Sequence, residues 1–507
     1  MPFDQKILIL GSETTDTDEM TSALASTQGT INHGLISSGA FAPVESGYYH
    51  TTVADLTPGE IVNISQYFDC VQMLDQPKET YPHYKSFVIT LRLMADLESQ
   101  GVNTEYRNNK SAENLMFWQQ YLKDNKSFCF YPFVVSVNDQ GDMATTCAKS
   151  TKAIRNIADI VDWATDPVYT DIRNKMLAGT RMPDICKVCY DSEDVGIESA
   201  RQYETLEWAQ QLSLEKPEDF LGFKSPVYYE LRPSNKCNIM CRTCDDAHSH
   251  LIEAEWKTIG FRLTNWKFGS APFDQIDFTQ LRRVYVGGGE PTIMTEFYDF
   301  LAKCVAIGKT DFELCIGTNG MKFSNKLLKL LDHFPKVLLS FSYDGYDLVN
   351  DYIRWKSDFK TMVDNSRILR QRGHTISLQT VFTMWNVTNL DRLFEFYDTE
   401  YPESGLLVQP TGNINAPFTP FNHPRPDLVL ESMRRCQQTK TYHTHGRSVK
   451  SMVDSIVDHY SNPAYTCDLE ALKGFFEYND TLDRSRNCRL GDYVPELEAC
   501  RRFILND

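Results

Sequence analysis

The stretch LRPSNKCNIMCRTCDDAH, residues 231–248, places Cys237, Cys241 and Cys244 within eight positions of a chain that otherwise spreads its cysteines thinly. Positions i, i+4 and i+7 share one face of a helix, so a buried cysteine stripe is one interpretation. The stretch also contains proline and asparagine, which favour loops, and it directly follows the apolar run at 227–232. The sequence therefore predicts three thiols on a loop at the carboxyl end of a strand.

A bound metal is the second interpretation of this spacing. A chain with 14 cysteines in 507 residues contains only about 0.01 C-x3-C-x2-C matches by chance. Thiolates this close repel one another unless a cation holds them, and sulfur ligands select zinc, Cu(I) or iron–sulfur clusters. A structural zinc takes four closed ligands, whereas three thiolates on a four-iron cluster leave one iron open to an exogenous ligand. Three cysteines without a fourth indicate a reactive metal centre.

The sequence around the cysteine stretch alternates six apolar runs with helical patterns. Strands separated by helices form a parallel sheet with right-handed crossovers, so the fold class is α/β. In such sheets the chemistry lies at the carboxyl ends of the strands. The six runs are 227–232, 282–288, 312–317, 336–342, 376–382 and 405–410. Three further strands are predicted near the N-terminus, at 6–11, 50–56 and 68–74.

The composition limits the class of function. The length of 507 residues, with 42% hydrophobic residues, predicts two to four domains. A formal net charge of −17 disfavours a protein that grips a nucleic-acid backbone with Lys and Arg, so nucleic acid is not the expected partner. The N-terminus lacks the features of a signal peptide, and no run of about 18 apolar residues predicts a membrane span. We therefore expect a cytoplasmic protein with reduced thiols and no membrane partner.

The motif GGGEP (287–291) ends the second apolar run. Together with the three cysteines after the first run, it resembles the radical S-adenosylmethionine (radical SAM) enzymes over about residues 225–412. The resemblance implies a partial (β/α)6 TIM-like barrel, a [4Fe-4S] cluster on Cys237, Cys241 and Cys244, and S-adenosylmethionine chelated by the open iron. It also implies a reductant such as flavodoxin or ferredoxin, reductive cleavage of S-adenosylmethionine to a 5′-deoxyadenosyl radical, and abstraction of hydrogen from a substrate.

The same resemblance assigns further residues to cofactor binding. The GGGEP edge would receive the methionine amino group, and Arg354, in NDYIRWKSDFKTMVDNS (350–366), would neutralise the carboxylate of the cofactor. Thr243 precedes the third cysteine, where the family commonly has an aromatic residue on adenine, so adenine contacts are expected from the fifth or sixth strand. The cofactor-binding residues implied are Gly288, Gly289, Glu290, Pro291, Thr318, Asn319, Ser340, Ser342 and Arg354. No catalytic side chain is assigned.

A second set of cysteines lies before this region: Cys129, Cys147, Cys186 and Cys189. A hairpin signature, NDQGD, separates the first two, and the last two form C-x2-C. Four thiolates alone favour zinc and an iron–sulfur cluster about equally. The stretch CFYPFVVSVNDQGDMATTC (129–147), followed by the C-x2-C pair, resembles the auxiliary-cluster modules called twitch or SPASM. That resemblance implies an auxiliary [4Fe-4S] cluster, with zinc as the alternative.

These features divide the chain into four expected parts. They are an N-terminal α/β domain of unknown role (1–110), a twitch- or SPASM-like module (111–224), the radical SAM core (225–412) and a C-terminal extension (413–507). The resembling families act mostly on peptide or protein side chains, which makes such a substrate the leading expectation. The alternatives are a nucleobase, sugar or small metabolite, and, in another class, a non-catalytic protein with structural metal.

Overall fold

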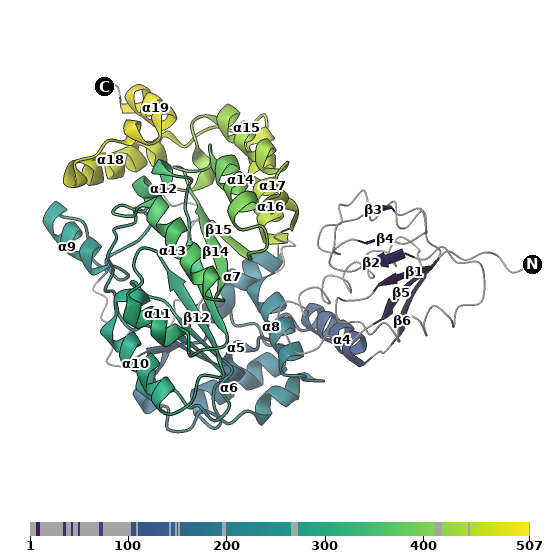
Figure 1. Ribbon diagram of the computed structural model, residues 1–507. Coiled ribbons are helices and arrows are strands. Elements are labelled where there is room, and N and C mark those ends of the chain that lie inside the picture. The colour runs from purple at the N-terminus through teal and green to yellow at the C-terminus, as the bar shows by residue number, and fades with distance from the viewer. Residues whose placement is uncertain are drawn as a thin grey trace, which may run out of the picture. The chain divides into compact units, whose positions relative to one another are not determined.

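The computed structural model describes residues 110–505 and six short strands between residues 7 and 107. The gaps within 110–505 are 141–142, 148–149, 151–152, 195–198, 265–271, 411–417 and 445–446. The chain forms two compact units: Met1–Phe130 with Ser192–Asp219, and Tyr131–Asp191 with Phe220–Asp507. Each unit has its own sheet (Figure 1).

The first unit contains a four-stranded parallel sheet in the order β2-β1-β5-β6. The strands predicted at 6–11 and 68–74 are confirmed as β1 and β5, and the one predicted at 50–56 lies outside the described residues except for His50. The strands are β1 (Ile7–Leu10), β2 (Gly34–Ile36), β5 (Cys70–Leu74) and β6 (Asn103–Arg107), with a separate antiparallel pair, β3 (Ala42–Pro43) and β4 (Tyr49–His50). Helices α4 (Lys110–Asp124) and α8 (Ala200–Gln211) pack on each other.

A buried ion pair organises the turn that leads into α8. The Arg201 guanidinium donates to both carboxylate oxygens of Glu193, at 2.8 and 2.7 Å, and Ser199 Oγ donates to the same carboxylate at 2.5 Å. The guanidinium also donates to three backbone carbonyls, those of Leu122, Asn125 and Phe128. One buried charge thus fixes the segment directly before Cys129 because all of these acceptors converge on it.

The second unit is built on a nine-stranded sheet in the order β15-β14-β13-β12-β11-β10-β7-β8-β9. Strands β10 to β15 lie in chain order and each pairs in parallel with the next. Their bounds are Tyr228–Leu231, Arg283–Val286, Glu313–Thr318, Val337–Ser342, Thr375–Phe382 and Leu406–Pro410. All six strands predicted from the alternating pattern are confirmed, and so is the α/β class with a mostly parallel sheet.

Three further strands extend this sheet beyond β10. Strand β7 (Val135–Gln140) pairs in parallel with β10 and turns back into the antiparallel strands β8 (Met143–Thr145) and β9 (Ala153–Asn156). The hairpin predicted around 138–142 is therefore present. Its first strand shares a sheet with the six core strands because Tyr228 pairs directly with Val135.

The main apolar core lies between the parallel strands and the helices that cover one face of the sheet (Figure 1). On β13, Val337, Leu339 and Phe341 point into this core, so the alternate residues Ser340 and Ser342 point to the opposite, inner face. The helices that contribute to the core are α10 (Thr295–Ala306), α11 (Asn325–Leu331), α13 (Phe359–Gln371), α14 (Leu390–Glu400), α15 (Pro426–Cys436), α16 (Lys440–Thr444) and α17 (Arg447–Ser461).

A second, smaller apolar core lies beneath the C-terminal helices. Helices α18 (Leu469–Arg486) and α19 (Pro495–Leu505) pack there with α12 (Leu348–Ile353). Its fully or nearly fully buried members include Tyr352, Ile353, Trp385, Phe475 and Phe476. Burial of this apolar surface fixes α18 against the segment that follows the fourth parallel strand. The remaining helices are α5 (Tyr131–Val134), α6 (Pro167–Leu177), α7 (Pro183–Asp194) and α9 (His250–Ile259).

His423, next to the short helical turn Pro420–Asn422, is fully buried. Its Nδ1 accepts from the backbone N–H of Arg425 at 3.1 Å, and its Nε2 has no partner among the described residues. Burial lowers the pKa of His423 to about 3, because the charged imidazolium would lose its hydration. The neutral ring is therefore the form that fits the fold.

This buried histidine predicts acid sensitivity. The unfolded chain binds the extra proton below about pH 6.5 and the folded chain only below about pH 3, so stability falls as pH drops through that window, by up to about 1.4 kcal/mol per pH unit. Denaturant unfolding at pH 7 and pH 4.5 should show a smaller difference between the two pH values for His423→Phe than for the wild type. His443→Phe, at an exposed position on α16, is the control. An unchanged pH difference in His423→Phe would contradict the prediction.

No helix in the described part of the chain is both long enough and apolar enough to cross a membrane.

Candidate active site at the carboxyl end of the parallel sheet

The three cysteines lie on an irregular loop that follows β10, as the sequence predicts. Cys237 is buried, while Cys241 and Cys244 are half-buried. The Cys237 backbone N–H donates to Nδ1 of His250 at 3.1 Å, and the Cys244 N–H donates to the Cys241 carbonyl at 3.2 Å. Ser249 then caps α9 by accepting from the backbone N–H of Ile252, so the loop runs directly into a helix.

Two backbone hydrogen bonds pair the cysteine loop with the segment after α12. The Met240 N–H donates to the Trp355 carbonyl at 2.8 Å and the Arg242 N–H donates to the Ile353 carbonyl at 2.7 Å. The two hydrogen bonds flank Cys241 on the loop and Arg354 on the other segment. The Cys241 thiol and the Arg354 guanidinium also interact electrostatically, because each shifts the pKa of the other. The chain thus brings a guanidinium next to a cluster-motif thiol.

The electrostatics of the loop agree with this pairing. Burial raises the pKa of Cys237 to about 12 and also raises the pKa values of Cys241 and Cys244. The neighbouring Cys241 thiol raises the pKa of Cys237 further, whereas the Arg354 charge lowers the pKa values of Cys237 and Cys241. These thiols are therefore protonated without a metal, and binding a thiophilic metal must release their protons.

Arg354 itself is held by one ion pair. It donates to Asp344 Oδ2 at 2.7 Å, and Asp344 Oδ1 accepts from the Val381 N–H at 2.9 Å. The Arg354 Nε is buried and has no partner among the described residues. One buried and two half-buried cysteines beside a guanidinium with a spare donor fit a [4Fe-4S] cluster with a carboxylate-bearing ligand, because the donors are soft sulfur and the spare hydrogen bond suits an anion.

The glycines of GGGEP press directly against the cysteine loop. Gly289 donates to the Ser234 carbonyl and Glu290 donates to the Lys236 carbonyl, both at 2.8 Å. A Cβ at Gly289 would lie 2.3 Å from the Lys236 carbonyl oxygen, and Gly288 has φ of +102°. Glycine is thus required at 289 because the two loops touch there and leave no room for a side chain. The resemblance implies a second reason, the close approach of a cofactor to the backbone.

Glu290 is fully buried and its carboxylate is surrounded by donors. Oε1 accepts from the Thr292 N–H at 3.1 Å, from Thr292 Oγ1 at 2.7 Å and from Thr318 Oγ1 at 2.8 Å, while Oε2 accepts from the Asn319 N–H at 2.6 Å. Burial raises the pKa of Glu290, whereas these donors lower it. Glu290 therefore joins the ends of β11 and β12. Its predicted contact with the methionine amino group, like that of the buried Pro291, stays a prediction.

Glu290→Gln is expected to lower the free energy of unfolding by about 1–3 kcal/mol, because either orientation of the amide places an NH2 group against a buried donor. Denaturant unfolding measures this change. Glu253→Gln, at a partly exposed position on α9, is the control and should change stability by less than about 0.5 kcal/mol. Equal stability of the wild type and Glu290→Gln would show that the carboxylate does not organise this edge.

Thr318 and Asn319 lie at the end of β12, against the cysteine loop. Asn319 Nδ2 donates to Asn238 Oδ1 at 2.8 Å and lies 3.9 Å from Cys237 Sγ. Thr318 Oγ1 accepts from the Gly320 N–H at 3.1 Å while donating to Glu290. Both residues are brought to the cysteines, and each already has protein partners.

Ser340 and Ser342 lie on the inner face of the sheet, and Ser377 Oγ donates to Ser340 Oγ at 3.0 Å. Tyr285 shares this face, because a Cβ on Gly317 would lie 2.5 Å from its hydroxyl oxygen. Gly287 and Gly317 therefore leave room for the Tyr285 ring. The inner face is polar next to the cysteine loop, which suits a polar ligand rather than an apolar one.

The second cysteine set is distributed along the chain as the sequence indicates. Cys129 is buried in the first unit. In the second unit, Cys147 follows β8, and Cys186 and Cys189 lie one turn apart on α7, all three half-buried. Among the described residues, no three Cys, His, Asp or Glu side chains are arranged as ligands of a single metal ion. The auxiliary metal stays a prediction.

The residues that sequence reasoning missed lie around Arg242, between the second and third cysteines. Its fully buried guanidinium donates to Asp483 on α18 at 2.5 Å and lies 3.6 Å from the centre of the Tyr352 ring. A basic residue between two ligand cysteines was the available signal. Nothing in the sequence pairs it with a residue 241 positions later.

Comparison with known proteins gives one family and several distant relatives. The model of the Radical SAM superfamily matches residues 231–397. The chain is 31% identical over 118 residues to the tungsten-containing aldehyde ferredoxin oxidoreductase cofactor-modifying protein of Pyrococcus furiosus, covering 23% of this chain and 30% of that protein. It is 25% identical over 174 residues to the mycofactocin maturase MftC of Mycolicibacterium smegmatis, covering 34% and 41%. The chain thus spans less than half of each of these curated relatives.

Solved structures show a weaker likeness. SuiB of Streptococcus suis bound to S-adenosylmethionine has 16% identity and a TM-score of 0.30, covering 53% of this chain and 59% of that one. The same protein bound to the precursor peptide SuiA has 15% identity and a TM-score of 0.28, covering 65% and 64%.

Proposed function

We propose that this chain, an enzyme of the radical SAM superfamily over residues 231–397, abstracts hydrogen from a peptide or protein side chain. The superfamily implies a [4Fe-4S] cluster and S-adenosylmethionine, and membership sets aside the alternative of a non-catalytic metal protein. The observation that carries the site assignment is the pair of backbone hydrogen bonds that brings Arg354 next to Cys241.

When bound, the cluster and S-adenosylmethionine supply the electron and the 5′-deoxyadenosyl group for radical chemistry. Cys237, Cys241 and Cys244 would hold the cluster and leave one iron open. Arg354 would orient the carboxylate of S-adenosylmethionine through its spare Nε donor, while Asp344 keeps the guanidinium in place. Glu290 would position Asn319 and Thr318, and the serines of β13 would face the substrate side.

A peptide substrate is favoured by two features. The segment 350–366, which contains Arg354, resembles the peptide-modifying branch of the family. The net charge of −17 disfavours nucleic acid. A protein reductant such as flavodoxin or ferredoxin would supply the electron.

We also propose that Cys129, Cys147, Cys186 and Cys189 hold an auxiliary [4Fe-4S] cluster, as in twitch or SPASM modules. Wild type should then contain about eight irons per chain after anaerobic reconstitution, and Cys186→Ala about four. Zinc at this set would instead give about four irons in both proteins, with zinc lost from the variant.

The proposed function is tested with anaerobically reconstituted protein, dithionite and S-adenosylmethionine. The wild type should form 5′-deoxyadenosine. This product should carry deuterium when deuterated peptides are supplied. A matched mixture of deuterated nucleosides and sugars is the control. Deuterium from the control mixture alone would assign a small-molecule substrate, and absence of any 5′-deoxyadenosine would contradict the catalytic assignment of the site.

A further inference from the structure

The cysteine loop contacts the segment that contains Arg354, and it also contacts the C-terminal helix α18. Arg242 is the second residue of the turn that the hydrogen bond from the Cys244 N–H to the Cys241 carbonyl closes. The Cys241 thiol interacts electrostatically with Arg354, whereas the Arg242 guanidinium contacts Tyr352 and Asp483. No Arg242 side-chain atom is exposed, so the side chain enters the protein rather than solvent.

All three guanidinium nitrogens of Arg242, and the plane of the group, contact other residues. Nε donates to the Tyr352 carbonyl at 2.9 Å, and the plane lies over the Tyr352 ring. Nη2 donates to Asp483 Oδ1 at 2.5 Å, and Nη1 donates to Asn479 Oδ1 at 3.4 Å. Tyr352 Oη donates to Asp483 Oδ1 at 3.0 Å, and Asp483 Oδ2 accepts from the Leu490 N–H at 2.7 Å. A planar guanidinium suits this forked and stacked arrangement, which lysine would not reproduce.

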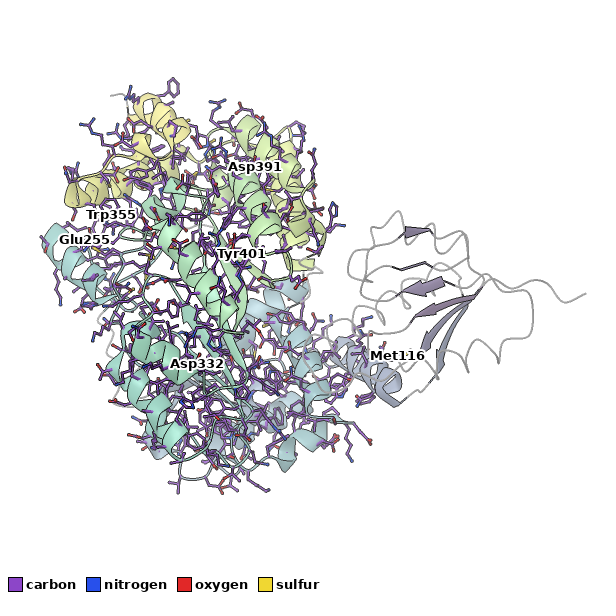
Figure 2. All side chains as sticks on the ribbon, viewed as in Figure 1. Met116, Glu255, Asp332, Trp355, Asp391 and Tyr401 are labelled. Carbon is purple, nitrogen blue, oxygen red and sulfur yellow. The ribbon has the colours of Figure 1, made fainter. Side chains whose placement is uncertain are left out.

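Helix α18 also contacts the loop backbone and the helix that follows it. Tyr478 Oη donates to the Arg242 carbonyl at 2.7 Å. Arg486 donates to both oxygens of Glu255 on α9, at 2.9 and 2.7 Å, and both side chains are at most 5% exposed. Figure 2 labels Glu255 on α9, and helix α18, which carries Arg486, lies next to α9. Helix α18 thus contacts the loop at Arg242 and contacts α9, the next helix, at Glu255.

We propose that Arg242, Asp483 and Tyr478 are positioning residues that hold the cysteine loop in the geometry that retains the cluster. The inference rests on the proposed cluster at Cys237, Cys241 and Cys244. The two α18 residues make their hydrogen bonds to the loop with Arg242, which lies between Cys241 and Cys244, so they act through the backbone of the loop. Buried ion pairs add little to stability compared with apolar packing, and fixing one register is their best-attested use. Here the fixed register is that of the metal ligands.

The test compares two variants with a control on the same helix. Asp483→Asn removes the charge that anchors Arg242, and Tyr478→Phe removes one hydroxyl while keeping the ring. Asp480→Asn is the control, because Asp480 lies on α18 but pairs with Arg501 at 2.8 Å and not with the loop. Each protein is reconstituted anaerobically, and three quantities are measured: the rate of iron loss to a chelator, the EPR signal of the reduced cluster with and without S-adenosylmethionine, and thermal unfolding.

Asp483→Asn should lose the cluster about 10- to 100-fold faster than wild type, the range seen when outer partners of metal ligands are removed. Tyr478→Phe should lose it about three- to tenfold faster, with a changed EPR signal on addition of S-adenosylmethionine. Asp480→Asn should stay within about twofold of wild type. If both variants retain the cluster as Asp480→Asn does, the inference is wrong. If Asp483→Asn does not fold, the rate of iron loss from Tyr478→Phe alone tests the inference. If the wild type itself binds no three-cysteine cluster, the proposed function is wrong instead.

Discussion

Cys241→Ala is expected to reduce 5′-deoxyadenosine formation by more than about 100-fold, which is the upper end of the loss caused by removing only an outer partner of a metal ligand. Cys241 sits opposite Arg354, flanked by two backbone hydrogen bonds, so its sulfur has a fixed direction that a neighbouring residue cannot supply. Cys237→Ala and Cys244→Ala should behave alike, because three ligands are the minimum for a cluster with one open iron.

The matched control is Cys304→Ala. Cys304 is fully buried in α10, within the main core and away from the cysteine loop, so its removal should affect packing only. We expect this variant to form 5′-deoxyadenosine within about twofold of wild type. Iron content, measured on the same samples, separates loss of the three-cysteine cluster from loss of all metal. Cys241→Ala should keep the auxiliary metal. Formation of 5′-deoxyadenosine at the wild-type rate by Cys241→Ala would remove Cys241 from the cluster site.

Gly289→Ala is expected to have the second largest effect. The new Cβ would lie 2.3 Å from the Lys236 carbonyl oxygen and 2.7 Å from the Asn235 carbonyl carbon, both of which are backbone atoms that cannot rotate away. The cysteine loop must shift, and the strain should lower the free energy of unfolding by roughly 1–3 kcal/mol. The variant should also lose its three-cysteine cluster at least about tenfold faster than wild type to an anaerobic chelator.

Gly405→Ala is the control for this prediction. Gly405 precedes β15 in the same sheet, and a Cβ there would meet nothing within 4 Å. Replacing a glycine with alanine at such a position should leave stability unchanged or raise it slightly, because the unfolded chain loses freedom. Equal cluster retention in Gly289→Ala and Gly405→Ala would mean that the loop tolerates the displacement.

The parallel sheet was predictable because its signal is local. Each of the six strands is an apolar run bounded by turn residues, and the cysteine loop follows the first of them. The extension by β7 to β9 was not predictable, because the hairpin signal at 138–142 says nothing about which strand it will join. Pairing of Val135 with Tyr228 is a contact across distant sequence.

The candidate site was predicted in its types of residue but not in its partners. Glu290, Thr318 and Asn319 follow the strands where the resemblance places them, yet the hydrogen bonds among them depend on adjacent strand ends. Asn479, Asp483 and Arg486 appear in the sequence as an ordinary polar face of an amphipathic helix. Packing of α18 in the second apolar core places that polar face against Arg242 and Glu255. The sequence of the helix alone does not indicate this packing.

The separation of Arg242 from Asp483 by 241 positions has a consequence for biosynthesis. At about 5–20 residues per second, a ribosome needs roughly 10–50 s to reach Asp483 after Arg242 has been made. Throughout that interval the three thiols lie on a nascent loop that lacks its second set of contacts. The thiols are therefore made, and can be reached from solution, before the helix that contacts the loop exists.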